Sequence, residues 1–284
     1  MTKLIAIDLD GTLLNENNKI SIKNLEAITS AQSKGIEVVI ATGRAHFDVQ
    51  TLFKDTGINT WIIGANGATI HSPNGKLYRS KAIQKQDAVN ILNWLEKEDY
   101  YYEVFSNHAI YTPQHGRELL AIEIDRMKSA NPEINVDQLS DAANKQFSQT
   151  GFSFIRSYRD FIGQDLDVYN VLAFSFNKEK LEKGRNHFKN LANLSIVSSA
   201  EHNFELEHID ASKGNALSML AEEFRIELSE TAAIGDSFND LSMLEIAGKS
   251  AAMGNAPQKI KNSCQVVTLP NTEDGVAHFI HSLR

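Results

Sequence analysis

The sequence predicts an α/β protein with a doubly wound, Rossmann-like core on a parallel sheet and a second, α+β domain inserted into that core. Two observations lead to this fold class. Apolar, strand-like runs alternate with helix-like segments in the first part of the chain, and the same alternation resumes from about residue 210. Alternating strands and helices are typical of a parallel sheet covered by helices, and the interruption between the two parts indicates an insertion.

The first predicted strand carries the chain's most informative residues. Residues 4–9 are almost continuously apolar, as in a strand buried on both faces, until Asp8 and Asp10 interrupt the run and Gly11 ends it. Carboxylates two residues apart point to one side of a strand, and ligands bind beyond the carboxyl ends of such strands. The pair suits a hard cation such as Mg²⁺. Asp-Gly is also ordinary turn chemistry, so these residues alone leave both interpretations open.

The other elements of the predicted core follow from periodicity and from turn residues. Ser21 is a candidate N-cap for a helix that ends at Gly35. Further elements before the insertion are expected as follows: a strand over 36–41, a helix ending at Gly57, a strand over 61–64 and a hairpin over 68–79. Elements after it are expected as follows: helices over 213–224, 241–246 and from Gly275, and strands over 231–234, 250–253 and 266–269.

The inserted segment has the texture of an α+β unit. Its expected elements are helices over 87–98 and 178–191, helical polar stretches within 116–147, and strands over 100–105, 109–111, 168–176 and 194–197. We therefore place the core at residues 1–82 and 210–284 and the inserted domain at 83–209.

Composition excludes several classes of partner. The 284 residues carry a net charge of −8, which disfavours binding to nucleic acid or an anionic membrane. No apolar run approaches the ~20 residues of a membrane helix, and Asp8 and Asp10 shorten the N-terminal run below that of a signal peptide. The single cysteine, Cys264, allows no internal disulfide and agrees with a reducing compartment. We expect a cytoplasmic protein, and the sequence carries no signal of its oligomeric state.

Two polar sites besides Asp8 and Asp10 suggest anion binding. Thr42-Gly43 ends the second predicted strand where a helix begins, and helix starts attract anions, although Thr-Gly is more often a simple turn. Lys213 opens a later helix against the helix dipole, which a nearby phosphate explains and which a surface lysine also tolerates.

A further polar site follows the predicted strand over 231–234. Asp236 is placed to complete a cation site with Asp8 and Asp10. Asn239 and Asp240 open the next helix, where N-capping is the simpler explanation for either residue.

In this order, the features resemble the four motifs of the haloacid dehalogenase (HAD) superfamily of phosphohydrolases. Asp8-Leu-Asp-Gly-Thr12 resembles the first motif, Thr42 the second, Lys213 the third and residues 235–240 the fourth. The insertion falls between the second and third motifs, as in the subgroup with a large α/β cap. Resemblance to the Cof-type branch (subclass IIB) rests on these stretches: Ala41-Thr-Gly-Arg44, Asn66-Gly-Ala68, Ser212-Lys-Gly214, Ala252-Met-Gly-Asn-Ala256 and Asn271-Thr-Glu-Asp-Gly-Val276.

The resemblance implies a Mg²⁺-dependent phosphatase in which Asp8 is the nucleophile and Asp10 the general acid and base. It implies metal ligation by the carboxylates of Asp8 and Asp236 and the main-chain carbonyl of Asp10, with Asp240 orienting the ligands. The residues expected to hold the phosphoryl group are the N–H of Leu9, Thr42, Gly43, Lys213 and Asn239. The candidate substrate contacts on core loops are Arg44 and Asn66.

The implied substrates are small phosphorylated metabolites: sugar phosphates, nucleotides, flavin mononucleotide or pyridoxal phosphate. Dehalogenases of the superfamily lack a second aspartate at the position of Asp10, so the resemblance favours a phosphatase over a dehalogenase. A phosphosugar mutase on the same core remains an alternative. A non-enzymatic sensor that is phosphorylated on Asp8 and a scaffold with a vestigial site are the others.

Overall fold

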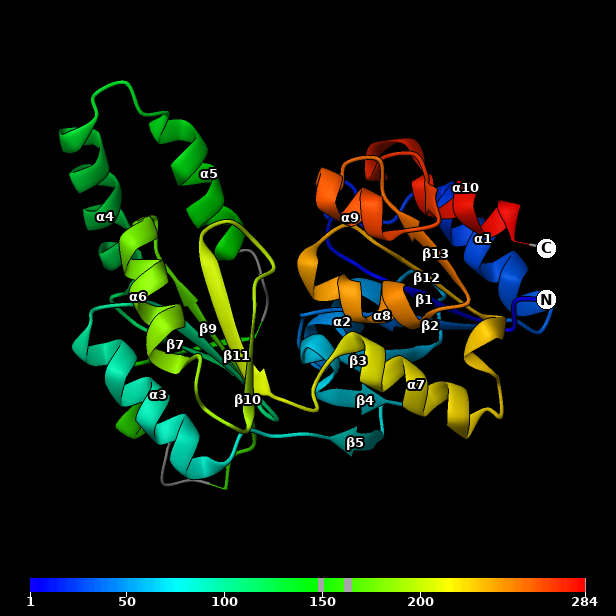
Figure 1. Cartoon of the computed structure of the whole chain (residues 1–284), viewed down its shortest axis with the longest axis horizontal. Coiled ribbons are helices and arrows are strands. Elements are labelled where there is room, and N and C mark those ends of the chain that lie inside the picture. Colours follow the sequence, from blue (N-terminus) through cyan, green and yellow to red (C-terminus); the bar gives the residue numbers. More distant parts are fainter. Residues whose placement is uncertain (148–150, 161–164, 284) are drawn as a thin grey trace. The chain divides into compact units, whose positions relative to one another are not determined.

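The computed structural model describes the chain except for residues 148–150, 161–164 and 284. It divides into two compact units, which Figure 1 shows in the colours of the sequence. The core unit comprises Met1–Lys81 and Asp210–Arg284, and the inserted unit comprises Ala82–Ile209.

The core unit is built on one sheet whose strands are parallel from β14 to β3 and antiparallel from β3 to β5. In sheet order the strands are β14 (Val266–Val267), β13 (Lys249–Ala252), β12 (Thr231–Gly235), β1 (Leu4–Ile7), β2 (Glu37–Ala41), β3 (Trp61–Gly64), β4 (Thr69–His71) and β5 (Leu77–Ser80). The first strand therefore lies in the middle, between β2 and the much later β12. This is a topological switch point, the place where open α/β sheets bind ligands.

Alternate residues of β1 point to opposite faces of the sheet, and both sets are apolar and buried. Helices therefore cover both faces of this sheet. Ile5 and Ile7 pack in a cluster with residues of α1, α2 and α10, whereas Leu4 and Ala6 pack with residues of α7, α8 and α9. Figure 1 shows α1 and α10, from the two ends of the chain, side by side. The helices are α1 (Ile22–Ser33), α2 (His46–Phe53), α7 (Lys213–Glu223), α8 (Leu241–Ile246), α9 (Gln258–Ser263) and α10 (Gly275–Ser282).

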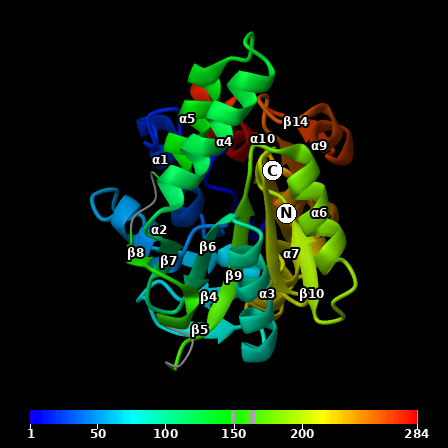
Figure 2. The same cartoon turned by 90° about the vertical axis from the view of Figure 1, so that its left-hand side faces the viewer.

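The inserted unit has its own, mostly antiparallel sheet. In sheet order its strands are β10 (Leu194–Val197), β11 (Asn203–His208), β9 (Val168–Phe174), β6 (Tyr101–Ser106), β7 (Ile110–Pro113) and β8 (Phe152–Ile155). Its helices are α3 (Lys85–Lys97), α4 (Gly116–Ala130), α5 (Val136–Gln146) and α6 (Lys178–Phe188). Figure 2 shows α4 and α5 as neighbours.

The two faces of the inserted sheet differ in chemistry. One face packs apolar side chains of β6, β9 and β11, such as Val104, Val171 and Leu206, against residues of α3 and α6. On the other face, register places Glu103 and Glu205 on either side of Leu172, and Glu207 beside Asn170. The three glutamates and Asn170 are all buried.

The predicted fold class is confirmed: a doubly wound α/β core carries an inserted α+β unit. Ser21 accepts a hydrogen bond from the N–H of Asn24 (3.1 Å), as expected of an N-cap, and Gly35 beyond α1 has a φ of +77°. Three elements, β8, β11 and α9, were not expected from the sequence. In the part of the chain that the structure describes, no helix combines the length and the apolarity needed to cross a membrane.

Candidate active site

The candidate site forms at the carboxyl ends of β1 and β12, the two strands that meet at the switch point. Asp8 directly follows β1 and is almost fully buried. Its backbone N–H donates to the carbonyl of Ile234 on β12 (3.0 Å), so the strand pairing fixes the backbone at this residue. Gly11 turns the chain sharply with a φ of +78°, and a Cβ there would lie 2.3 Å from Oδ2 of Asp236. The turn interpretation of Asp-Gly is therefore confirmed at this strand end, and the cation site stays a prediction.

Lys213 is the cation of the site, and its side chain is fully buried. Its ammonium donates to Oδ1 of Asp8 (2.7 Å) and to Oδ1 of Asp240 (2.6 Å). Burial lowers the pKa of Lys213, but the two carboxylates outweigh burial and hold it above its usual value. The lysine that opens α7 is thus a buried counter-charge and not a surface residue.

Asp240 organises the loop after β12. Its Oδ2 accepts hydrogen bonds from the backbone N–H groups of Asp236 and Ser237, both at 2.9 Å. Asp240 is thus the third residue of a capping box whose N-cap is Ser237, in the short helical turn Phe238–Asp240, and it also contacts Lys213. The expected N-cap role at the start of α8 is wrong, because Asp240 makes no side-chain cap hydrogen bond there.

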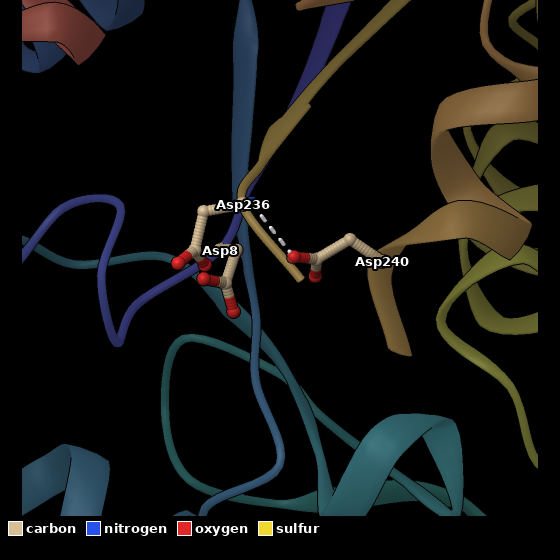
Figure 3. Close-up of side chains that lie close together, drawn as sticks. All are labelled: Asp8, Asp236 and Asp240. Carbon is tan, nitrogen blue, oxygen red and sulfur yellow. Dashed lines mark hydrogen bonds between the residues drawn. The ribbon is translucent and has the colours of Figure 1, made fainter. Parts of the chain in front are cut away.

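Asp236 completes a group of three carboxylates with Asp8 and Asp240, in which one oxygen from each residue lies within 4.8 Å of the other two. Figure 3 shows the Asp8 and Asp236 carboxylates next to each other, with Asp240 approaching from the start of α8. Burial, followed by the negative charge of the neighbouring aspartates, raises the pKa of both Asp8 and Asp236 well above the usual carboxyl range, although Lys213 opposes this. One ammonium leaves this cluster short of positive charge.

The polar residues at the end of β2 and β3 form a second group. The hydroxyl of Thr42 accepts from the N–H of Arg44 (3.1 Å), so its proton remains available to donate to a ligand. Asn66 is buried with a left-handed backbone, and its Oδ1 accepts from the amide of Asn239 (3.0 Å). The structure therefore shows Asn66 supporting Asn239, and its contact with a substrate stays a prediction.

Arg44 also binds residues of the protein itself. Its guanidinium donates to both carboxylate oxygens of Asp10, at 2.7 Å each, and to Oδ2 of Asp48 (2.6 Å). The Asp10 carboxylate is thus held by Arg44 and is not a member of the acidic group. The Arg44 side chain is only 8% exposed, whereas that of Asp10 is 38% exposed. A direct contact between Arg44 and a substrate stays a prediction.

Comparison with known proteins identifies the family. A model of the haloacid dehalogenase-like hydrolase family matches residues 5–280. The chain belongs to this family. It is 56% identical over 283 residues to phosphatase YwpJ of Bacillus subtilis, covering 99% of both proteins. It is 41% identical over 281 residues to 5-amino-6-(5-phospho-D-ribitylamino)uracil phosphatase YwtE of B. subtilis, covering 99% of this chain and 98% of YwtE.

A solved structure of a haloacid dehalogenase-like hydrolase from B. subtilis covers 100% of both chains at 56% identity, with a TM-score of 0.88. The family predicted from the four motifs is confirmed. So is the predicted enzyme class, a phosphoric monoester hydrolase, because relatives that match the whole chain are phosphatases by name.

The acidic group fits the divalent metal ion that HAD phosphatases generally use. Carboxylate oxygens are the donors that hard cations such as Mg²⁺ prefer. The buried Asp8 and the partly buried Asp236 lie near each other in surroundings that disfavour their ionised forms, and a dication at this place offsets that cost. The residues present therefore suit a hard divalent cation.

Three residues of the site had no assigned role from sequence. Asn255 donates to the carbonyl of Gly11 (2.8 Å), and Thr12 contacts Oδ1 of Asp236 (3.4 Å). Asp48, in the first turn of α2, binds Arg44, which precedes that helix. The helical i,i+4 rule does not predict this pair, because Arg44 lies outside the helix. Asn255 lies in the stretch over 252–256, for which the sequence indicates a family resemblance but no role of the individual residue.

Proposed function

We propose that this HAD-family hydrolase is a Mg²⁺-dependent phosphatase that cleaves small phosphorylated metabolites through an aspartyl-phosphate on Asp8. The observation that carries the proposal is the buried Lys213 ammonium bound to Asp8 at the switch point of the sheet. A cation in this position offsets the repulsion between an attacking carboxylate and a phosphate dianion.

In the first proposed step, a carboxylate oxygen of Asp8 attacks phosphorus and the bond from phosphorus to the leaving oxygen breaks. Asp10 donates a proton to that oxygen, which leaves as an alcohol. The side chain of Asp10 is 38% exposed, so its carboxylate can reach the leaving oxygen of a substrate.

In the second step, Asp10 accepts a proton from a water molecule as its oxygen attacks the aspartyl-phosphate. The bond between phosphorus and Asp8 breaks, releasing inorganic phosphate and restoring the carboxylate. The phosphoryl oxygens are held through both steps by these groups: the N–H of Leu9, Thr42, Gly43, Lys213 and Asn239.

The residues proposed to hold Mg²⁺ are Asp8 and Asp236 through their carboxylates and Asp10 through its main-chain carbonyl. When bound, Mg²⁺ supplies positive charge that offsets the charge on the phosphoryl oxygens. Asp240 positions the backbone at Asp236 through the hydrogen bonds described above, so its proposed role is to orient the metal ligands.

The inserted unit is proposed to act as the cap that selects the leaving group, and the core unit as the catalytic domain. The 41% identity to YwtE makes a phosphorylated ribitylamino compound one candidate substrate. Sugar phosphates, nucleotides, flavin mononucleotide and pyridoxal phosphate are the other classes to compare, ranked by kcat/KM in one panel.

The test is phosphate release from an aryl phosphate by the purified protein, with Mg²⁺ and with excess chelator. We expect many turnovers per protein with Mg²⁺ and almost none with chelator. A single equivalent of phosphate transferred to the protein, with no further release, would identify a phospho-aspartate sensor. Undiminished turnover in chelator would refute the metal assignment, and intramolecular transfer on a sugar phosphate without net release would indicate a mutase.

A further inference from the structure

The side chain of Arg44 binds two carboxylates of very different exposure. One is Asp48, which is 1% exposed on the first turns of α2, and the other is Asp10, which is 38% exposed. Asp48 accepts a hydrogen bond from Nη1 of Arg44, and Asp10 receives two parallel hydrogen bonds from the Nε and Nη2 atoms of Arg44. Such a fork fixes the plane of a carboxylate as well as its distance.

Arg44 is itself rigidly held. Its N–H donates to the Thr42 hydroxyl (3.1 Å), and its carbonyl accepts from the N–H of Ala65 (2.9 Å). Asp48 then fixes the far end of the guanidinium by a 2.6 Å ion pair at i,i+4. The backbone and Asp48 of α2 thus hold Arg44 in place, and Arg44 in turn holds the more exposed Asp10.

Stability alone does not explain this arrangement. Asp48 by itself gives the buried guanidinium a charged partner, and an ion pair to a carboxylate as exposed as Asp10 contributes little to folding. What the fork adds is orientation: without it, the carboxylate of Asp10 rotates about two side-chain bonds in a loop that Gly11 opens.

We propose that Arg44, anchored by Asp48, is a positioning residue that sets the Asp10 carboxylate for proton transfer. This inference rests on the proposed function, in which Asp10 is the general acid and base. Each Asp10 oxygen that accepts from Arg44 keeps lone-pair capacity for a proton, so the ion pair and proton transfer are compatible. A lysine cannot replace the fork, because its ammonium is a single point of charge.

The first experiment separates positioning from substrate contact by comparing Arg44→Lys with wild type on an aryl and an alkyl phosphate. A general acid matters most when the leaving group is poor, and general acid–base catalysis contributes ~10²–10⁴-fold. We expect kcat on the alkyl phosphate to fall by about 10-fold or more with KM nearly unchanged. On the aryl phosphate, the initial burst of phenolate should be retained and the later steady rate should fall. A rise in KM on both substrates with kcat preserved would overturn the proposal in favour of a substrate contact. Arg79→Lys, at an exposed position on β5, is the matched control.

The second experiment places Arg44→Lys in an Asp10→Asn background. If Arg44 acts through Asp10, the double variant should be no slower than Asp10→Asn alone. If the double variant is slower than Asp10→Asn by the same factor that Arg44→Lys costs on its own, the inference is overturned and the proposed function stays intact. An Asp10→Asn protein with wild-type turnover would instead contradict the proposed function. A third variant, Asp48→Asn, keeps the shape of the side chain that anchors Arg44 and removes its charge. Its kcat on the alkyl phosphate should fall, but by less than that of Arg44→Lys. A wild-type kcat on the alkyl phosphate in this variant would count against the anchoring role of Asp48.

Discussion

Two sheets of this protein bury carboxylates, and they neutralise them in different ways. In the core unit, Asp8 and Asp240 share the ammonium of Lys213, with Asp236 beside them. In the inserted unit, the Tyr101 hydroxyl donates to Glu103 (2.6 Å), and the Asn170 amide donates to Glu205 (2.7 Å). Two core carboxylates thus pair with a charged group, whereas these contacts in the inserted sheet come from neutral dipoles.

The difference teaches where single substitutions have large effects. Removing the only partner of a buried charge costs ~3–5 kcal/mol, whereas losing a hydrogen bond to a charged group costs ~1.5–3 kcal/mol. The core cluster also carries more negative than positive charge, so its properties should respond to pH and to metal ions. The predictions below test this contrast, beginning with the largest effect.

Asp8→Asn should abolish turnover while leaving the fold intact. Loss of a nucleophile in an assembled site costs ~10⁴–10⁶-fold in kcat. The substitution keeps the shape of the side chain and removes a charge that burial disfavours. Steady-state kinetics and thermal unfolding, with the exposed Asp55→Asn as the matched control, measure both effects. A kcat of Asp8→Asn within tenfold of wild type would contradict the assignment of Asp8 as the nucleophile.

Lys213→Met should destabilise the metal-free protein by ~3–5 kcal/mol, because Asp8 and Asp240 lose their shared buried cation. Glu205→Gln in the inserted sheet should cost less, ~1–3 kcal/mol, because its amide can keep part of the hydrogen bonding. Denaturant unfolding of both variants compares the two regions directly. Equal losses would show that charge balance does not distinguish them.

The stability that Asp8 and Asp236 contribute to the metal-free protein should fall as the pH rises from about pH 4 towards neutrality. Unfolded carboxyls ionise near pH 4, but Asp8 and Asp236 have raised pKa values when folded, so the native state binds more protons across this window. Asp236→Asn should flatten the slope. Mg²⁺ should raise Tm more at about pH 8 than at about pH 5, because it binds ionised carboxylates. A Mg²⁺ effect that is independent of pH would contradict the account.

The smallest expected effect concerns the inserted sheet. Glu205→Gln should keep kcat on a small aryl phosphate within about threefold of wild type, a change of less than 1 kcal/mol in the barrier. It should alter the ranking of phosphorylated metabolites by kcat/KM if the inserted unit selects the leaving group. An unchanged ranking would show that Glu205, on this face of the sheet, does not affect which substrate is preferred.

The same contrast explains how far the sequence predicts the structure. The core strands β1, β2 and β12 were predictable because both of their faces are apolar. Strand β11 was missed although Phe204 and Leu206 alternate with polar residues as in a half-buried strand, and the burial of Glu205 and Glu207 on its other face was not predictable from that alternation. Helix α9 escaped prediction because it is short and buries only Ile260. Periodicity records burial of apolar residues, so it fails where the buried residues are polar.

Prediction of the site shows a parallel limit. Motif order placed Asp8, Lys213 and Asp236 at one sheet edge, and the structure brings their side chains together. Arg44 and Asn66 were expected to face a substrate because they are polar residues next to motifs. In the structure both are buried and bind other site residues, Asp10 and Asn239. Sequence identifies residues that belong to the site, whereas which polar partner each one takes depends on packing.

The most direct test of the central claim is to trap the phosphorylated intermediate. Asp10→Asn lacks the proposed base, so after mixing with Mg²⁺ and an aryl phosphate it should release one equivalent of phenolate and stop. Peptide mass spectrometry after acid quench should then find the phosphoryl group on Asp8. Release of phenolate with Asp8 unmodified, or with the phosphoryl group on another residue, would contradict the account.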